Sequence, residues 1–169
     1  EAPIQIKLQE LLFHELEDSG ILSQGVGADI DAFKIAIQNT LYRQSDMDQG
    51  KAIRIQDGYF KLKQSYLDSN YFGAITCDSQ ESAPPSRVEV TNSVITNTKP
   101  TPEGARLSGI QGYGLSSWKC DLSVNKVLLQ NNHFYGIGTF NEHETPTVLT
   151  IEDTIIRDTK PLNAFRTSD

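Results

Sequence analysis

The chain contains one eleven-residue pattern twice. VEVTNSVITNT occupies residues 88–98, LTIEDTIIRDT occupies residues 149–159, and Lys-Pro follows both copies. An internal repeat constrains a fold strongly, because every copy must form the same local structure and bury its apolar face against a neighbouring copy. The repeat therefore decides the fold class before composition does.

The same pattern fits four further segments. Its elements are two alternating apolar residues, a polar corner, an apolar pair and a polar end. The six fits are residues 6–16 (IKLQELLFHEL), 35–45 (IAIQNTLYRQS), 60–70 (FKLKQSYLDSN), 88–98, 122–132 (LSVNKVLLQNN) and 149–159. The distance between successive fits varies while the pattern is kept, so we expect insertions to fall in turns.

Each unit opens with apolar residues at its first and third positions, and this period of two indicates a half-buried strand. Equivalent strands of successive units are expected to stack in parallel, about 4.8 Å apart. Residues 4–16 are rich in Leu, Gln and Glu, which favour a helix by propensity. Alignment with the other five units overrules that propensity. We predict strand and turn there, and less than about a tenth of helix in the whole chain.

The strands written V-x-V-x-N-S-x-I-x-x-N resemble those of the pectin-lyase-like superfamily. In that superfamily a Gly followed by an aliphatic residue comes after such strands, and the corresponding segments here are Gly20-Ile21, Gly73-Ala74-Ile75, Gly109-Ile110 and Gly136-Ile137. The resemblance covers residues 4 to about 161. It implies an all-β fold: a single-stranded right-handed parallel β-helix, or solenoid, of about six coils.

The resemblance also bears on domain organisation and location. We expect residues 1–169 to form one β-helix domain and to be part of a longer solenoid, because no capping segment is visible at either end. The superfamily holds polysaccharide lyases, glycoside hydrolases, tailspikes, adhesins and many secreted bacterial proteins. The resemblance therefore implies an extracellular or cell-surface protein, but it does not fix an activity.

The catalytic signatures of the superfamily's enzymes are missing. The chain has no Arg-x-Pro-x-x-Arg stretch, and it has no Asn-Thr-Asp, Asp-Asp, Gly-His-Gly or Arg-Ile-Lys. The nearest approach, Arg54-Ile55-Gln56-Asp57, lacks the lysine. We therefore predict no catalytic residues and a non-catalytic scaffold that binds a glycan or a protein partner through its side faces. The alternative is a carbohydrate-active enzyme with an incomplete or unrecognised active site.

Charge and hydropathy exclude several classes of partner. The net charge is −7 and no block of Lys and Arg occurs, which argues against nucleic acid. No run of 18 apolar residues is present, so we expect no membrane insertion. Cys77 and Cys120 fit no metal-site spacing. The repeat alignment places them on different faces more than one unit apart, so we predict two free thiols.

Two acidic segments contain residue types that are found in metal sites. His14, Glu15, Glu17 and Asp18 carry ligand types that suit a divalent cation, and Asp46-Met-Asp48-Gln-Gly50 resembles part of a calcium loop. We interpret both as solvated polar turns, and we expect neither a metal nor a cofactor. Asn39 and Asn92 align at one corner of units two and four, where amides would satisfy the backbone of the turn.

Aromatic residues follow the repeated core in units three and five. Alignment places the two groups two units apart, about 9 to 10 Å along the axis, which is close to the length of a disaccharide. We predict a sugar-binding platform, and either Phe134→Ala or Tyr135→Ala should weaken sugar binding. In the alternative interpretation, one aromatic of each group fills the core. The predicted ligand-binding residues are Tyr71, Phe72, His133, Phe134 and Tyr135.

A second predicted site is an apolar stripe. Period two turns Val94 outward, yet its aligned residues in all units are apolar, which would expose enough apolar area to mark an interface. The aligned residues are Leu12, Leu41, Tyr66, Val94, Leu128 and Ile155. We expect self-association through this stripe or through the end units, and replacement of Leu41 and Leu128 by Ser should abolish it. If the corner bends one residue later, these side chains are core instead.

Overall fold

The computed structural model describes residues 4–42, 50–80, 83–100, 112–140 and 147–160, and every element in these segments is a β-strand. The prediction of an all-β chain is confirmed for this part. The strands are β1 (Ile4–Gln9), β2 (Leu12–His14), β3 (Ser19–Phe33), β4 (Ala36–Gln38), β5 (Lys51–Lys63), β6 (Tyr66–Asp68), β7 (Gly73–Asp78), β8 (Ser86–Thr91), β9 (Val94–Thr96), β10 (Tyr113–Trp118), β11 (Cys120–Asn125), β12 (Leu128–Gln130), β13 (Ile137–Phe140), β14 (Leu149–Glu152) and β15 (Ile155–Arg157).

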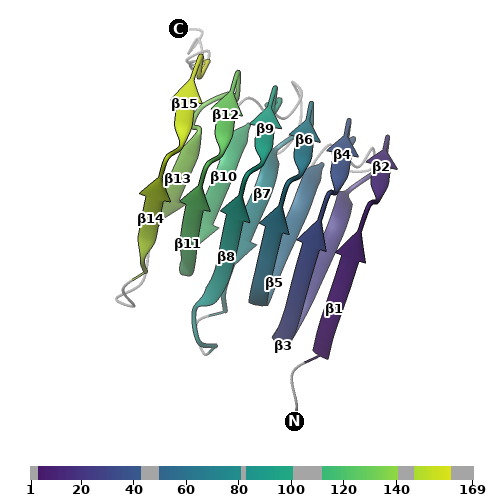
Figure 1. Ribbon diagram of the computed structural model, residues 1–169, viewed down its shortest axis with the longest axis vertical. Helices are drawn as coiled ribbons and strands as arrows, with labels where there is room; N and C mark the ends of the chain where they lie inside the picture. The colour runs from purple at the N-terminus through teal and green to yellow at the C-terminus, as the bar shows by residue number, and fades with distance from the viewer. Residues whose placement is uncertain (1–3, 43–49, 81–82, 101–111, 141–146, 161–169) are drawn as a thin grey trace, which may run out of the picture.

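The strands pair in parallel, in two hydrogen-bonded sheets. One sheet has six strands in the order β15-β12-β9-β6-β4-β2, and the other has nine strands and contains the order β13-β10-β7-β5-β8-β11-β14. In Figure 1 a short strand follows each of the strands β1, β3, β5, β8, β11 and β14. This arrangement is compatible with a parallel β-solenoid, because equivalent segments of successive repeats lie side by side.

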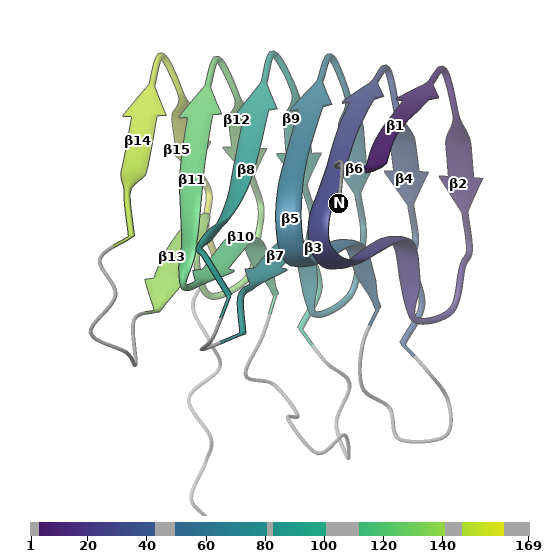
Figure 2. The same cartoon turned by 90° about the horizontal axis from the view of Figure 1, so that it is seen from below.

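The pairings form three rows. The first row contains β1, residues 28–33, residues 58–63, β8, β11 and β14. The second row is the six-stranded sheet, and the third row contains residues 19–24, residues 51–56, β7, β10 and β13. The long strands β3 and β5 contribute to both the first and the third row, which is why these two rows form one sheet. Figure 2 shows the first and second rows facing each other, with β7, β10 and β13 joining them below.

Single residues with left-handed backbone form the corners on either side of the second row. The φ angles are 50° at Asn92, before β9, and 56° at Asn97, after it. Such a conformation is unfavourable for residues other than Gly, least so for Asn and Asp. Backbone hydrogen bonds between corners offset it, as when Asn92 N donates to Asn125 O over 3.1 Å. The polar corners of the sequence pattern are therefore tight turns.

Alternate residues of each row point inward and form one core. Phe60 in the first row, Ile75 in the third and Leu129 in the second are each at most 1 % exposed. Where the third row begins, the backbone passes very close to its neighbours: a Cβ on Gly114 would lie 2.5 Å from Gly136 O and 2.7 Å from Leu129 Cδ2. A glycine is required there, because any side chain would collide with backbone.

Two buried asparagines stabilise the turn that follows the second row. Asn132 is 1 % exposed, and its side-chain Nδ2 donates to Ile95 O over 3.2 Å. Its Oδ1 accepts from Thr98 N at 3.2 Å and from Thr98 Oγ1 at 2.6 Å. Asn70 makes the same three bonds to Thr40 and Ile37 two repeats earlier. The pairs satisfy backbone groups that would otherwise be buried without partners.

The prediction for residues 4–16 is confirmed, because β1 and β2 lie there and the segment between them is a turn. Helix propensity is a weak preference, and pairing with β3 and β4 overrides it.

The predicted alignment of the second repeat is wrong by five residues. Ile6 is in register with Ile30, and Ile30 is in register with Phe60, so the second unit begins at Ile30 and not at Ile35. First-row and second-row strands both alternate apolar and polar residues, so a shift from one strand to the next leaves the hydrophobic pattern intact. The same correction separates the two aligned asparagines: Asn39 lies at the corner after the second row, and Asn92 lies at the corner before it.

The prediction of free thiols is also wrong, because Cys77 and Cys120 form a disulfide with a Cα–Cα distance of 6.2 Å. The strand ladder explains the pairing. Cys77 is in register with Ser117, and only Lys119 separates β10 from β11, so the chain returns at once to the neighbourhood of Cys77. Counting repeats along the sequence overestimated the separation, because it ignored how tight this corner is.

Candidate functional site

The rings of five aromatic residues form a cluster on the outer side of β10 and β13. Two ring pairs stack: Trp118 on Phe140, with centroids 4.6 Å apart, and Tyr113 on Tyr135, with centroids 6.0 Å apart. Phe134 joins them through Tyr113 at 5.6 Å and Tyr135 at 4.0 Å. We call these five residues the aromatic face.

Strand register creates the stacked pairs. Trp118 is directly opposite Phe140 on the neighbouring strand, so their rings are separated by about one strand spacing. Gly138 has no side chain, and this leaves space for the Phe140 ring. A Cβ at position 138 would lie 3.1 Å from Phe140 Cε2. The Tyr135 side of the face is open, with 42 % of that residue exposed, whereas Tyr113 is 4 % exposed. Burial raises the pKa of Tyr113 above its ordinary value.

A column of small polar residues lies beside these rings. Thr76 and Ser116 are in register on β7 and β10, and they point outward because Ile75 and Cys77 on either side of Thr76 belong to the core. They are 1 % and 2 % exposed, and neither hydroxyl has a hydrogen-bond partner within the described segments. Buried hydroxyls without partners are uncommon in folded proteins. Neither oxygen is accessible from the surface, so these two hydroxyls are not available to a ligand in this structure.

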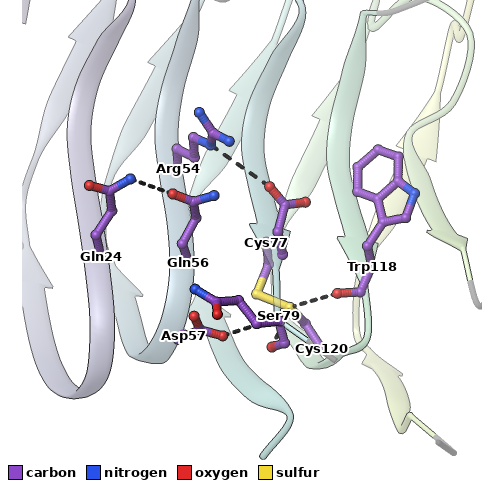
Figure 3. A network of polar contacts seen from close by, with 10 residues as sticks. Gln24, Arg54, Gln56, Asp57, Cys77, Ser79, Trp118 and Cys120 are labelled. Carbon is purple, nitrogen blue, oxygen red and sulfur yellow. Dashed lines mark hydrogen bonds and ion pairs between the residues drawn. A yellow bond between two sulfur atoms is a disulfide. The ribbon is translucent and has the colours of Figure 1, made fainter. Parts of the chain in front are cut away.

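The column continues to an ion pair. Arg54 is in register with Thr76, and its Nε lies 3.8 Å from an Asp78 carboxylate oxygen, as Figure 3 shows by the dashed line above Cys77. Burial raises the pKa of Asp78, and the nearby Arg54 opposes that shift. The outer side of the third row thus changes from charged residues to aromatic residues along its length.

The predicted ligand-binding residues separate into two groups. Phe134 and Tyr135 belong to the aromatic face. His133 lies at the corner beside Lys160, and burial together with Lys160 lowers its pKa. Tyr71 instead contacts Tyr42, with ring centroids 5.3 Å apart, and Phe72 is buried beneath Lys51, whose Nζ lies 3.8 Å from the ring centroid. For Phe72 the structure matches the alternative interpretation, in which one aromatic of the group fills the core.

Tyr113, Trp118 and Phe140 were not predicted. Trp118 is the only tryptophan of the chain, and this was the sequence feature that could have indicated a site residue. The sequence pattern did not place it, because a long insertion separates the repeated core of the fourth unit from β10, and its register with Phe140 follows only from strand pairing.

The predicted apolar stripe lies on the outer side of the second row, with Ala36 in the place predicted for Leu41. Leu12, Tyr66, Val94, Leu128 and Ile155 occupy one register position, and Ala36 completes it. Leu41 does not belong there, because it pairs with Glu17 beyond the second row. Leu12 is 70 % and Ile155 57 % exposed, whereas Val94 and Leu128 are half-buried. A role in self-association stays a prediction.

The corrected register changes the variant that tests the stripe. We expect Tyr66→Ser with Leu128→Ser to abolish any self-association and to leave the fold intact, because surface substitutions usually change stability by about 0.5 kcal/mol or less. Sedimentation velocity measures the association. The pair Gln38→Ser and Gln130→Ser is the control, because both glutamines lie at one register position on the same outer side of the second row. Dimers that persist in the first variant would contradict a role for the stripe.

Other sites are not supported by the segments described. No group of three or more His, Cys, Asp or Glu side chains in them is arranged to hold a metal ion. Within the same segments there is no helix that is long and apolar enough to cross a membrane.

Comparison with known proteins adds no assignment. The chain matches no protein-family model, no curated protein and no solved structure. The arguments for function therefore rest on the residues of this chain.

Proposed function

We propose that this chain is a single-stranded right-handed parallel β-helix of about six coils that resembles the pectin-lyase-like superfamily. Its role is that of a secreted or cell-surface scaffold that binds a glycan on its side and does not cleave it. The parallel rows and the single-residue corners support the fold. The Cys77–Cys120 disulfide supports the location, because disulfides persist mainly in oxidising compartments.

The observation that carries the glycan proposal is the aromatic face, with its two stacked ring pairs and its exposed Tyr135. A sugar ring presents a C–H surface that packs on aromatic rings and hydroxyl groups that need hydrogen-bond partners. The hydroxyl of the exposed Tyr135 both donates and accepts hydrogen bonds, so it suits a sugar hydroxyl in either role. The net charge of −7 favours a neutral glycan over a polyuronate.

Binding without cleavage agrees with the acidic residues of this side. Glycoside hydrolysis generally uses two carboxyl groups about 5 to 10 Å apart. Asp78 is the only carboxylate among the described outward residues of the third row, and Arg54 is its ion-pair partner. The missing catalytic signatures point the same way.

The test uses the fluorescence of Trp118, which reports on the aromatic face specifically because no other tryptophan is present. We expect at least one of four neutral hexasaccharides, cellohexaose, mannohexaose, xylohexaose or hexa-N-acetylchitohexaose, to change the emission spectrum. Tyr135→Ala and Phe140→Ala should each weaken that binding by roughly tenfold, which corresponds to about 1.4 kcal/mol.

Tyr71→Ala is the matched control, because Tyr71 is an aromatic of the other group and should leave the affinity unchanged. The proposal fails if none of the four hexasaccharides changes the emission at about 10 mM, a concentration well above the Kd of ordinary weak sugar binding. It also fails if binding is unaffected by both substitutions in the aromatic face.

A further inference from the structure

A cleft lies apart from the aromatic face, at the corner where the third row turns into the first. Its volume is about 410 Å³, within the usual range for small-molecule sites. Segments of three successive repeats contribute to it: residues 27–29 of β3, residues 57–59 of β5, and the turn that leads into β8. The larger side chains that line it are those of Asp29, Asp57, Tyr59, Pro84, Pro85 and Arg87.

The turn that forms one wall is held from several sides. Ser79 Oγ donates to Ser86 Oγ over 2.6 Å, and Ser86 N donates to Ser79 Oγ over 2.7 Å, which closes the turn at its base. Lys119 Nζ donates to Gln80 O and to Ala83 O, both at 2.7 Å. Figure 3 shows Ser79 beside the disulfide at this corner. Pro84 and Pro85 therefore lie between two hydrogen-bonded residues, Ala83 and Ser86, of one polar framework.

One carboxylate of the cleft belongs to the same framework. Asp57 is 3 % exposed, and its Oδ1 accepts a hydrogen bond from Gln80 N over 2.9 Å. The floor has no side chain at Gly27 or Gly58, and a Cβ on Gly58 would lie 2.8 Å from Ala28 O. Glycine at position 58 is required by this close approach of two backbones, and the absence of side chains leaves space above them.

The remaining lining combines one aromatic ring with charges of both signs. Lys61 Nζ lies 4.6 Å and Arg87 Cζ 5.6 Å from the centroid of the Tyr59 ring, so two cations hold this ring. Burial raises the pKa of Tyr59 above its ordinary value. Arg87 also pairs with Glu89 at 2.7 Å, so its charge is largely compensated.

We propose that this cleft binds one sugar residue of a neutral glycan, as a second subsite separate from the aromatic face. The class of ligand in this inference rests on the proposed function, whereas the site itself consists of different residues. Tyr59 and the two prolines form an apolar surface for the C–H side of the sugar. The Asp29 carboxylate accepts hydrogen bonds from sugar hydroxyls, and the Arg87 guanidinium donates hydrogen bonds to them. A planar acceptor group and a planar donor group together suit neighbouring hydroxyls on one sugar ring.

Other ligand classes fit this lining less well. An anion would meet Asp29 and Asp57, and the one guanidinium of the lining is already paired with Glu89. A purely apolar ligand would take the charged groups of Asp29 and Arg87 further out of water and offer them no polar contact, which is costly. A metal ion lacks ligands, because the described residues include no cluster of three suitable side chains.

Nuclear magnetic resonance tests the two subsites separately in one titration. The probes are the neutral disaccharides cellobiose, mannobiose, xylobiose and N,N′-diacetylchitobiose, which are short enough to occupy one subsite. We expect at least one of them to shift the backbone amides of Gly27, Gly58 and Arg87. Tyr59→Ala and Arg87→Gln should each weaken the binding seen at these amides by at least tenfold and leave the rest of the spectrum unchanged.

Tyr66→Ala serves as the control, because Tyr66 is a partly exposed aromatic of the second row. The Trp118 indole signal reports on the aromatic face in the same spectra. Cleft amides that shift while the indole does not would support this subsite and count against the proposed function of the aromatic face. The inference is overturned if no disaccharide shifts the cleft amides, or if their shifts persist in both cleft variants.

Discussion

Replacement of Cys77 and Cys120 together by Ser is expected to lower the free energy of unfolding by about 4 kcal/mol. The disulfide joins residues separated by 43 positions, and closing a loop of that size removes much of the entropy of the unfolded chain. Both cysteines are 1 % exposed and lie in the hydrophobic core, so two serine hydroxyls there add a cost of burial. Urea denaturation followed by circular dichroism measures the difference.

The wild-type protein unfolded in the presence of a reductant gives an independent value for the same cross-link. Ser123→Ala is a suitable control, because Ser123 alternates with core residues on β11 and points away from the core. Peptide mapping without reduction should recover the two cysteine-containing peptides joined. Separate peptides, or a double variant as stable as the wild type, would show that the bridge does not form.

Replacement of Leu129 by Ala is expected to lower the free energy of unfolding by about 2 to 5 kcal/mol, whereas Leu128→Ala should change it by about 0.5 kcal/mol. The two leucines are adjacent on β12 and point to opposite sides. Leu129 is fully buried and contacts the position of Gly114, so its loss leaves a cavity. Leu128 is half-buried in the outward stripe.

The matched pair needs no further control, because the substitution, the strand and the local backbone are the same. Chemical denaturation of both variants gives the two values from one type of experiment. Equal losses of stability would mean that the second row does not alternate as described, and the stripe would then be part of the core. A large loss for Leu128 alone would reverse the assignment of inside and outside.

The sequence predicted strands well and register less well. Alternation at Val88 and Val90 indicates a half-buried strand whatever lies around it, and the polar corner at Asn92 indicates a turn. Both signals depend only on residues that are close together in the sequence. The second repeat was misplaced because residues 35–37 alternate as well as residues 30–32 do. Only the hydrogen-bonded pairing of Ile30 with Phe60 distinguishes the two.

The candidate sites were predicted in part for a related reason. Phe134 and Tyr135 directly follow a repeated core, so the repeat itself drew attention to them. Trp118 and Phe140 come from strands that the repeat pattern does not cover, and their stacking depends on register across β10 and β13. The corner cleft was not predicted, since it joins residues 27–29, 57–59 and 84–87, whose proximity exists only after three repeats have stacked.

The sequence by itself determined that this chain forms short strands with tight polar corners, and that equivalent strands stack in parallel. It could do so because period-two alternation and turn chemistry act over a few residues, and the repeat shows that the same solution recurs. The tertiary structure alone decided the register of the second repeat, the bridge between Cys77 and Cys120, the aromatic face and the cleft. Each of these depends on which residues of separate repeats come within a few ångströms of one another, and insertions of variable length between the repeats remove that information from the linear pattern.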